Sequence, residues 1–212
     1  MSPNCAYCSA TFNKNYAILN LDWMTILIDA VKDTPEGQTY IANCSRWNDA
    51  VHEKTPRPIT IFTTLFFSNK SQPELHKSDK APFAKQINGY SLFESGSPEV
   101  QIDPRFLVDE NDIVLQKTRW YAGAGNALEQ ILRARDVDTV IISGLSMSGA
   151  VMSTMYHLID LDYKIYLISE NLLELPATDT AKYLNFLLGN LLSKMHVEVI
   201  SLEEALRALD ES

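Results

Sequence analysis

The sequence predicts an α/β protein in which helices cover both faces of a mainly parallel central sheet. Short runs of apolar, β-branched and aromatic residues alternate along the chain with longer segments of helical periodicity. The short runs are apolar throughout, as expected of strands buried on both faces of a parallel sheet. A chain of 212 residues, 46% of them hydrophobic, can bury one substantial core, so a single domain is expected.

Each predicted strand is an apolar run of strand length. The clearest is ITIFTTLFF at residues 59–67, which is rich in β-branched and aromatic residues. In chain order, the predicted strands are residues 16–22, 59–67, 112–117, 139–144, 164–169 and 197–201.

Predicted helices lie within residues 36–54 and at residues 126–136, 148–161, 180–195 and 202–209. In the helix at 126–136, Leu128 and Leu132 fall on one face and Asn126 is the expected N-cap. Residues 68–111 are rich in Ser, Pro, Lys and Asp, so we expect a long connection with little regular structure. Connections of this length often act as lids or interface arms.

Charge and hydropathy exclude several classes of partner. A net charge of −9, with no basic stripe interleaved with aromatic residues, argues against nucleic acid. No apolar run approaches the roughly 20 residues that a membrane-spanning helix needs. The first residues lack the charged and apolar regions of a secretory signal, so a cytoplasmic protein is expected. Residues 1–15 are predicted to be an N-terminal extension and residues 16–212 the folded domain.

The three cysteines do not form a disulfide framework. Cys5 and Cys8 make a C-x-x-C pattern, but no second pair of cysteines or histidines follows at zinc-binding spacing. We therefore interpret them as two incidental thiols in a frayed N-terminal segment. The four histidines are scattered, so neither a metal nor another cofactor is predicted.

Parallel sheets bind ligands at the carboxyl ends of their strands, which directs attention to the residues that follow each apolar run. Asp22 ends the first predicted strand, where partial desolvation raises a carboxyl pKa and favours a general acid or base. Asp29, at the end of TILID, has a similar setting. Lys117 ends the third predicted strand and can pair with Asp22 or with an anionic substrate. Taken alone, a residue at such a position is more often structural, Asp22 as a cap and Lys117 as a surface lysine.

The strand at 139–144 runs into SGLSMSGAVMST, a turn that feeds directly into a helix. Small residues there let a ligand approach the backbone, and the N–H groups of Gly149 and Ala150 can hold an oxyanion or a carboxylate. Many enzymes place a nucleophile at such a junction, but Ala150 occupies that position here. Neither Ser146 nor Ser148 has glycines two residues away on both sides, as a G-x-S-x-G nucleophile elbow requires, so a serine hydrolase is disfavoured.

The segments YAILNLDWM and 114–169, with their spacing, resemble the isochorismatase-like (cysteine hydrolase) superfamily. That family has an Asp after the first strand, a K-x-R-[YW] pattern, and a later strand that ends in G-[VIL]-x-T-x-x-C-V, where this chain has GLSMSGAV. The resemblance implies a three-layer α/β/α sandwich as a single domain over residues 16–212. It also implies a hydrolase that acts on a small-molecule substrate, and a homo-oligomer, either a dimer or a tetramer.

The same resemblance implies roles for individual residues. Asp22 corresponds to the general acid or base, Lys117 to its partner lysine, and Ala150 to the usual nucleophilic cysteine. Leu145 and Ser146 lie in the segment whose cis peptide shapes the oxyanion hole. The zinc ligands of nicotinamidase-type members have no counterpart after residues 59–67, so that branch is disfavoured.

Four aromatic residues are candidate walls of the substrate pocket, with ordinary core packing as the alternative for each: Trp23, Phe67, Trp120 and Tyr121. Gly123 and Asn126 depart from the family pattern, which usually has an aromatic residue and a threonine there. These departures predict a wider or differently lined pocket.

Three explanations of Ala150 are open. In the first, the chain is a noncovalent hydrolase in which Asp22 and Lys117 cleave an activated bond, such as a vinyl ether, a lactone or an imine; true isochorismatases are similar, with glycine at this site. In the second, Ala150 replaces the cysteine of an amidase-type hydrolase in an engineered variant. In the third, the protein binds a ligand without catalysis.

General acid–base catalysis supplies a rate enhancement of only about 10²–10⁴-fold, so an unactivated amide is a poor substrate without a thiolate. The first explanation is favoured.

Overall fold

The computed structural model describes residues 10–12, 14–77, 80–87, 93–187 and 191–212. Within these residues, six parallel strands form one sheet in the order β3-β2-β1-β4-β5-β6. The strands are β1 (Tyr16–Leu21), β2 (Ile59–Leu65), β3 (Ile113–Lys117), β4 (Thr139–Leu145), β5 (Lys164–Leu173) and β6 (Glu198–Ile200). The predicted parallel sheet is confirmed, with β1 and β4 at its centre.

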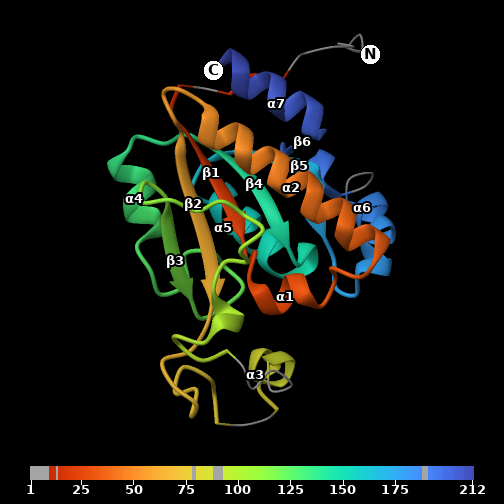
Figure 1. The fold of residues 1–212 in the computed structure, drawn as a ribbon. Coiled ribbons are helices and arrows are strands. Elements are labelled where there is room, and N and C mark those ends of the chain that lie inside the picture. Colours follow the sequence, from red (N-terminus) through yellow and green to blue (C-terminus); the bar gives the residue numbers. More distant parts are fainter. Residues whose placement is uncertain (1–9, 13, 78–79, 88–92, 188–190) are drawn as a thin grey trace.

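Helices cover both faces of the sheet, as Figure 1 shows. On one face lie α1 (Thr25–Asp29), α2 (Pro35–Glu53) and α7 (Leu202–Glu211), and on the other α4 (Leu128–Ala134) and α5 (Met152–Ile159). The chain also forms α3 (Pro82–Ile87) between β2 and β3, and α6 (Thr180–Phe186) after β5. The sheet and its two helical layers make the predicted three-layer α/β/α sandwich.

The packing of β1 explains why the predicted strands show no alternation of polarity. Ile18 packs into the core shared with α2 and α7, whereas Leu19 and Leu21 pack into the core shared with α4 and α5. All three residues are fully buried. Because helices cover both faces of the strand, both sets of positions are apolar.

The segment predicted as one helix at 180–195 is helical in its described residues up to Lys194, but the type of helical hydrogen bonding changes along it. α6 ends at Phe186, residues 188–190 lie outside the described part, and Leu192–Lys194 form a 3₁₀ turn. Leu187 and Leu192 are nevertheless buried in the same core. The apolar pattern thus identified which side chains are buried, but it did not specify the backbone hydrogen bonding that carries them.

Residues 68–100 of the 68–111 connection lie, where they are described, beyond the carboxyl ends of the strands, at the bottom of Figure 1. The rest of the connection returns along α2, where Arg105 O and Leu107 O accept from Ser45 and Asn48. Single-residue bridges join Phe67 to Glu94 and Met24 to Ile102. Apart from α3 and a 3₁₀ turn at Pro98–Val100, its described residues have no regular helix or strand, as predicted. The connection therefore covers the edge of the sheet at which ligands bind in such folds.

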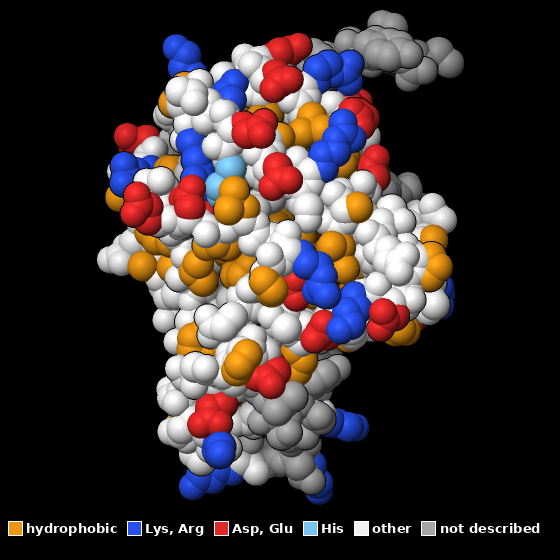
Figure 2. Space-filling view, viewed as in Figure 1, with side chains coloured by type: hydrophobic (Ala, Val, Ile, Leu, Met, Phe, Trp, Pro, Cys, Tyr) orange, Lys and Arg blue, Asp and Glu red, His pale blue; other side chains and the backbone are white. Residues whose placement is uncertain are grey.

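The face formed by α2 and α7 carries interspersed acidic and basic side chains (Figure 2). Arg46 of α2 pairs there with Glu203 of α7. No helix among the described residues has the length and apolar character required to cross a bilayer. Cys5 and Cys8 lie outside the described residues, whereas Cys44 is a buried residue of α2.

Gly144 allows β4 to lie closely against β1. It pairs in register with Leu21, and a Cβ atom on it would lie 2.5 Å from Leu21 Cβ and 2.6 Å from Leu21 O. Neither atom can move without shifting the strand. Gly144→Ala is therefore expected to destabilise the fold by about 3 kcal/mol, measured by urea unfolding.

Gly96→Ala is the control for this substitution. A Cβ atom on Gly96 would meet nothing within 4 Å, although its φ of +84° is left-handed. The control is expected to lose only about 1–2 kcal/mol, the cost of that backbone conformation. A loss at Gly144 no larger than that at Gly96 would show that β4 does not need this close approach.

Candidate active site

Asp22 stands where β1 ends. Its N–H donates to Thr63 O of β2 at 3.1 Å, as in a regular ladder, but its own φ is 58°. A non-glycine residue with this left-handed backbone carries strain of about 1–2 kcal/mol, although aspartate tolerates it better than most. The residue is only 2% exposed. Strained residues held in place by their surroundings are common at functional sites, which marks Asp22 as a candidate.

Lys117 reaches Asp22 from two strands away. Because β2 lies between β3 and β1, the lysine and aspartate side chains together bridge about 10 Å of sheet. Lys117 Nζ lies 2.6 Å from Asp22 Oδ2 and donates to the carbonyl of Trp120 at 3.0 Å. Thr63, on the intervening strand, donates its hydroxyl to Asp22 Oδ1 at 2.9 Å. Each oxygen of the Asp22 carboxylate therefore has a donor in place.

Burial sets the proton affinities of this pair. It raises the pKa of Asp22, while the charge of Lys117 and the hydrogen bonds from Lys117 and Thr63 lower it in part. Burial also lowers the pKa of Lys117, against the opposing effect of the Asp22 carboxylate. The two proton affinities are closer together than those of a free aspartate and a free lysine. Such a pair can give a proton to a bound molecule or receive one.

The turn after β4 begins beside Asp22, because β4 pairs with β1. The Leu145–Ser146 peptide is cis, as the family resemblance predicts. A π-helical turn follows at Met147–Val151 and continues directly into α5. The predicted helix at 148–161 is thus present, with a wide first turn.

The backbone amides of this turn differ in what they contact. Ser148 N donates to Glu174 Oε2 at 2.7 Å. The amides of Gly149 and Ala150 follow in the first turn, where N–H groups have no acceptor one turn back in the helix. The Ala150 methyl group is fully buried in the core with α4 and α5.

A cavity of about 60 Å³ lies beside Asp22. Its lining residues are Asp22, Met24, Leu27, Leu65, Ile87, Phe93, Trp120, Ser146 and Leu175. Two of them, Ile87 and Phe93, come from the 68–111 connection, which therefore forms part of the wall. The connection is held to Trp120 by a hydrogen bond from Trp120 Nε1 to Gln86 Oε1 at 3.1 Å. Phe83 of α3 packs edge-on to the same ring, with the centroids 5.1 Å apart.

Comparison with known proteins identifies the family. The family model described as "Isochorismatase domain" matches residues 16–204. The chain belongs to the isochorismatase family. A curated relative, N-carbamoylsarcosine amidase of Arthrobacter sp., is 29% identical over 121 residues, which make up 57% of this chain and 44% of that protein. The match thus spans less than half the length of this relative.

Solved structures of the family share the fold. The cysteine hydrolase of Pseudomonas syringae pv. phaseolicola 1448A has a TM-score of 0.73 at 15% identity, covering 100% of this chain and 99% of the other. An isochorismatase family protein of Burkholderia thailandensis has a TM-score of 0.70 at 19% identity, covering 94% of this chain and 98% of the other. N-carbamoylsarcosine amidase of Thermoplasma acidophilum has a TM-score of 0.68 at 17% identity, covering 89% of this chain and 97% of the other. At these identities the likeness establishes the isochorismatase fold, and chemistry must be argued from the site.

Asp22 and Asp29, the two carboxylates that the sequence offers as candidate acids or bases, lie in different environments. Asp22 lines the cavity, whereas Asp29 ends a helix, is 47% exposed at its side chain, and pairs with Lys32 at 2.8 Å. Lys117 takes the first of its two expected partners, Asp22, and is not among the lining residues. Within this isochorismatase fold, Asp22 is the carboxylate that a molecule in the cavity would meet.

Of the four aromatic residues expected in the pocket wall, Trp120 lies among the lining residues. Trp23 packs instead in the core under α2, with its ring centroid 5.8 Å from that of Phe62 and 4.4 Å from that of Phe106. It follows Asp22 directly, so it extends toward a different part of the molecule.

Phe67 and Tyr121 also differ from the expected position. Phe67 is fully buried behind the cavity wall, in a cluster with Phe93. Tyr121 packs on the α4 and α5 side, where its hydroxyl donates to Glu129 Oε1 at 3.0 Å. Gly123 makes room for this ring, because a Cβ atom on it would lie 2.5 Å from Tyr121 Oη. The missing side chain of Gly123 therefore accommodates Tyr121 and does not widen the cavity.

Asn126 fixes the loop between β3 and α4. Its Nδ2 donates to the carbonyls of Gln116 and Ala122, both at 2.7 Å, and its Oδ1 accepts from Leu128 N at 3.0 Å. The N-cap of α4 is therefore Ala127, not Asn126 as predicted. The predicted effect of Asn126 on the pocket is not seen, since the residue does not line the cavity.

Glu174, which no sequence motif distinguishes, joins the two loops on one side of the site. It is 3% exposed and accepts from Ser148 N at 2.7 Å and from Leu175 N at 2.8 Å. It thereby ties the turn after β4 to the end of β5. Because Leu175 lines the cavity, Glu174 also supports its wall.

Glu174→Ala is expected to destabilise the protein by about 2–3 kcal/mol, because two backbone amides lose a charged acceptor. Glu174→Gln keeps one oxygen acceptor and is expected to lose less. Chemical unfolding of the two variants beside the wild type measures the difference. Wild-type stability in Glu174→Ala would show that the hydrogen bonds by which Glu174 joins the loops do not stabilise the fold.

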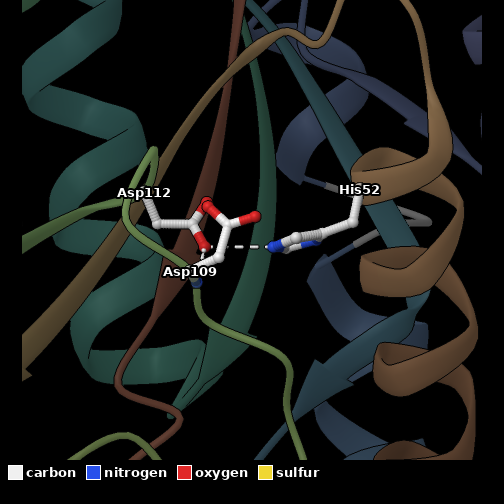
Figure 3. A group of neighbouring side chains, drawn as sticks. All are labelled: His52, Asp109 and Asp112. Carbon is white, nitrogen blue, oxygen red and sulfur yellow. Dashed lines mark hydrogen bonds and ion pairs between the residues drawn. The ribbon is translucent and has the colours of Figure 1, made fainter.

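His52, Asp109 and Asp112 form a separate group, drawn in Figure 3. Their ligand-type atoms lie within 4.8 Å of one another, with His52 Nε2 3.0 Å from Asp112 Oδ2. Arg57 donates to Asp109 Oδ2 at 2.6 Å and also to Asp112, and His52 Nδ1 lies 2.7 Å from Asn48 O. Because a guanidinium already engages both carboxylates, we interpret the group as an ion-pair network that ties α2 to the segment before β3. Sequence spacing gave no signal of it, since His52 and Arg57 lie more than 50 residues before the two aspartates.

Proposed function

We propose that this chain is a noncovalent hydrolase of the isochorismatase family, in which Asp22 and Lys117 act by acid–base catalysis on a small metabolite with an activated bond. The observation that carries the proposal is the 2.6 Å contact between Lys117 Nζ and Asp22 Oδ2 at the cavity. Asp22 lines the cavity and Lys117 stands behind it, so the carboxyl group meets the substrate and the lysine adjusts its proton affinity.

The proposed reaction needs no covalent intermediate. Protonated Asp22 gives its proton to the atom whose protonation makes the neighbouring carbon electron-poor: the outer vinyl carbon of a vinyl ether, the nitrogen of an imine or the carbonyl oxygen of a lactone. Water adds to the electron-poor carbon and gives a proton to the Asp22 carboxylate, which restores the starting state. The adduct then collapses, and a hydroxyl proton passes to the leaving oxygen or nitrogen as its bond to carbon breaks. One water is consumed for each bond cleaved. Ala150 is no handicap in this sequence of steps, because no nucleophilic side chain is used.

Backbone amides are proposed to support this chemistry. The N–H groups of Gly149 and Ala150, at the start of the turn, are suited to hold an oxyanion or another electron-rich oxygen. Ser146, which lines the cavity, offers a hydroxyl on the same side. Leu145 is proposed to take part only through its backbone, at the cis Leu145–Ser146 peptide where the turn begins.

An amidase-type cysteine hydrolase whose nucleophile is replaced by Ala150 is the second candidate. It is supported by the names of two matches, an N-carbamoylsarcosine amidase and a cysteine hydrolase. Without a thiolate the covalent route to amide cleavage is lost, so this candidate predicts an inactive chain as given. A ligand-binding protein without catalysis is the third. A homo-oligomer, dimer or tetramer, stays a prediction that light scattering checks.

The test is a mass-spectrometric assay of hydrolysis on isochorismate and on a panel of small lactones, imines and amides. The proposal predicts hydrolysis of at least one lactone, imine or vinyl ether by the chain as given. Binding of panel members with no product in any reaction would favour the third candidate over the first.

A further inference from the structure

We propose that the cavity selects an uncharged, mainly apolar group and excludes substrates that present a carboxylate to it. This inference rests on the proposed function in one respect, that the cavity beside Asp22 is the substrate site. It narrows the substrate class by the chemistry of the wall.

The wall offers no positive charge. Apart from Asp22 and Ser146, the lining side chains are hydrocarbon, thioether or indole. No lysine, arginine or histidine is among the described lining residues. The residues that the structure does not describe, 1–9, 13, 78–79, 88–92 and 188–190, contain none of these three residue types either. This chain therefore has no basic side chain at the cavity to receive an anion.

The basic side chains next to the wall are already engaged. Lys117 is fully buried, and its ammonium contacts Asp22 and the carbonyl of Trp120. Arg119 donates to Thr118 O at 2.6 Å and to Glu74 O at 2.9 Å. Its guanidinium also lies over the Phe83 ring, 4.9 Å from the centroid. Neither cation is available to a substrate carboxylate without breaking these contacts.

Polar groups of the cavity match a neutral amide or ester better than a carboxylate. The Ser146 hydroxyl can donate to a carbonyl oxygen, and Asp22 can accept from an N–H or O–H group or donate when protonated. A carboxylate in the same place would face the Asp22 carboxyl group and lose its hydration without a counter-ion. Burying an unpaired charge is far more costly than burying a neutral group that keeps its hydrogen bonds.

The volume limits the group to a small one. A cavity near 150 Å³ accommodates benzene, whereas this one measures about 60 Å³. Ile87 and Phe93 of the 68–111 connection close one side, and the Trp120–Gln86 hydrogen bond holds that side in place. A larger group would need this connection to move.

Binding of propionamide and propionate, which have the same number of heavy atoms, tests the inference. The indole N–H signals of the three tryptophans report on binding in an NMR titration at pH 7.5. Propionamide is expected to bind at least tenfold more tightly than propionate and to shift one indole signal. Benzamide is expected to bind more weakly than propionamide because of its size. Propionate binding as tight as propionamide, tighter binding of benzamide, or no binding of propionamide would each overturn the inference.

A variant that adds a positive charge to the cavity wall sharpens the test. Leu27→Arg places a cation at a half-buried lining position and is expected to raise the affinity for propionate at least tenfold. Leu107→Arg is the matched control, since Leu107 is 50% exposed and does not line the cavity. Unchanged propionate affinity in Leu27→Arg would count against selection by charge.

The two proposals fail in distinguishable ways. Selectivity for propionamide without hydrolysis of any panel compound would leave this inference standing and overturn the proposed function. Hydrolysis of isochorismate, abolished by Asp22→Asn, would do the reverse, because isochorismate carries carboxylates.

Discussion

Asp22→Asn is expected to lower the rate of hydrolysis by about 10²–10⁴-fold, the contribution of a well-placed general acid or base. Asparagine has nearly the same shape, and its amide oxygen can still accept from Lys117, which now contacts Asp22 Oδ2 at 2.6 Å. Its amide nitrogen then faces Thr63, whose hydroxyl now donates to Asp22 Oδ1 at 2.9 Å and can turn to accept. The proton is lost, but the shape of the cavity is retained. Product formation under single-turnover conditions measures the change, with ligand affinity measured in parallel.

Asp29→Asn is the matched control. It makes the same chemical change at an exposed carboxylate on the same segment, paired only with Lys32. The control is expected to leave the rate unchanged. Equal rates in wild type and Asp22→Asn would remove Asp22 from the mechanism, and a parallel loss in both variants would point to a general effect of charge.

Lys117→Met is expected to destabilise the fold by about 3–5 kcal/mol, because it leaves the Asp22 carboxyl group buried without its charged partner. Lys117 is fully buried and Asp22 is 2% exposed, so bulk solvent does not reach the position that the ammonium leaves. The pKa of Asp22, already raised by burial, is expected to rise further once the lysine charge is gone. Urea unfolding measures the loss.

The double variant Asp22→Asn/Lys117→Met separates the pair from the packing of its side chains. With both charges removed, it is expected to be more stable than Lys117→Met alone. Lys32→Met is the control, since it breaks an exposed pair and is expected to change stability little. If the double variant loses the sum of both single losses, the two residues do not act as a pair.

Much of the fold was predictable because uniform burial leaves a simple trace in the sequence. The strands of a sheet covered on both faces are buried on both sides, and every residue of 16–21 and 139–145 is buried. Most of these residues are apolar, and the polar exceptions are Asn20, Thr139 and Ser143. The change from α-helical to 3₁₀ hydrogen bonding within 180–195 was not predictable in the same way, because Leu187 and Leu192 are buried with either kind of bonding. Local apolar patterns report burial more directly than they report hydrogen bonding.

The site was predictable only where it follows from strand ends. Asp22 and Lys117 end β1 and β3, and the rule for parallel sheets places both at one edge. The walls of the cavity are made of side chains from distant segments, and sequence spacing does not show which of these meet. Trp23, for example, was expected in the pocket but packs in the core. Glu174 has no motif, and its importance appears only when Ser148 N is seen to donate to it.

Hydrolysis by the protein with Ala150 in place decides between a noncovalent enzyme and a disarmed cysteine hydrolase. Wild type and Ala150→Cys are compared on one lactone and one unactivated amide, while the intact mass of the protein is followed during turnover. A noncovalent mechanism predicts lactone cleavage by the wild type with no change in protein mass. Cleavage confined to Ala150→Cys, with an acyl adduct on the new cysteine, would contradict it.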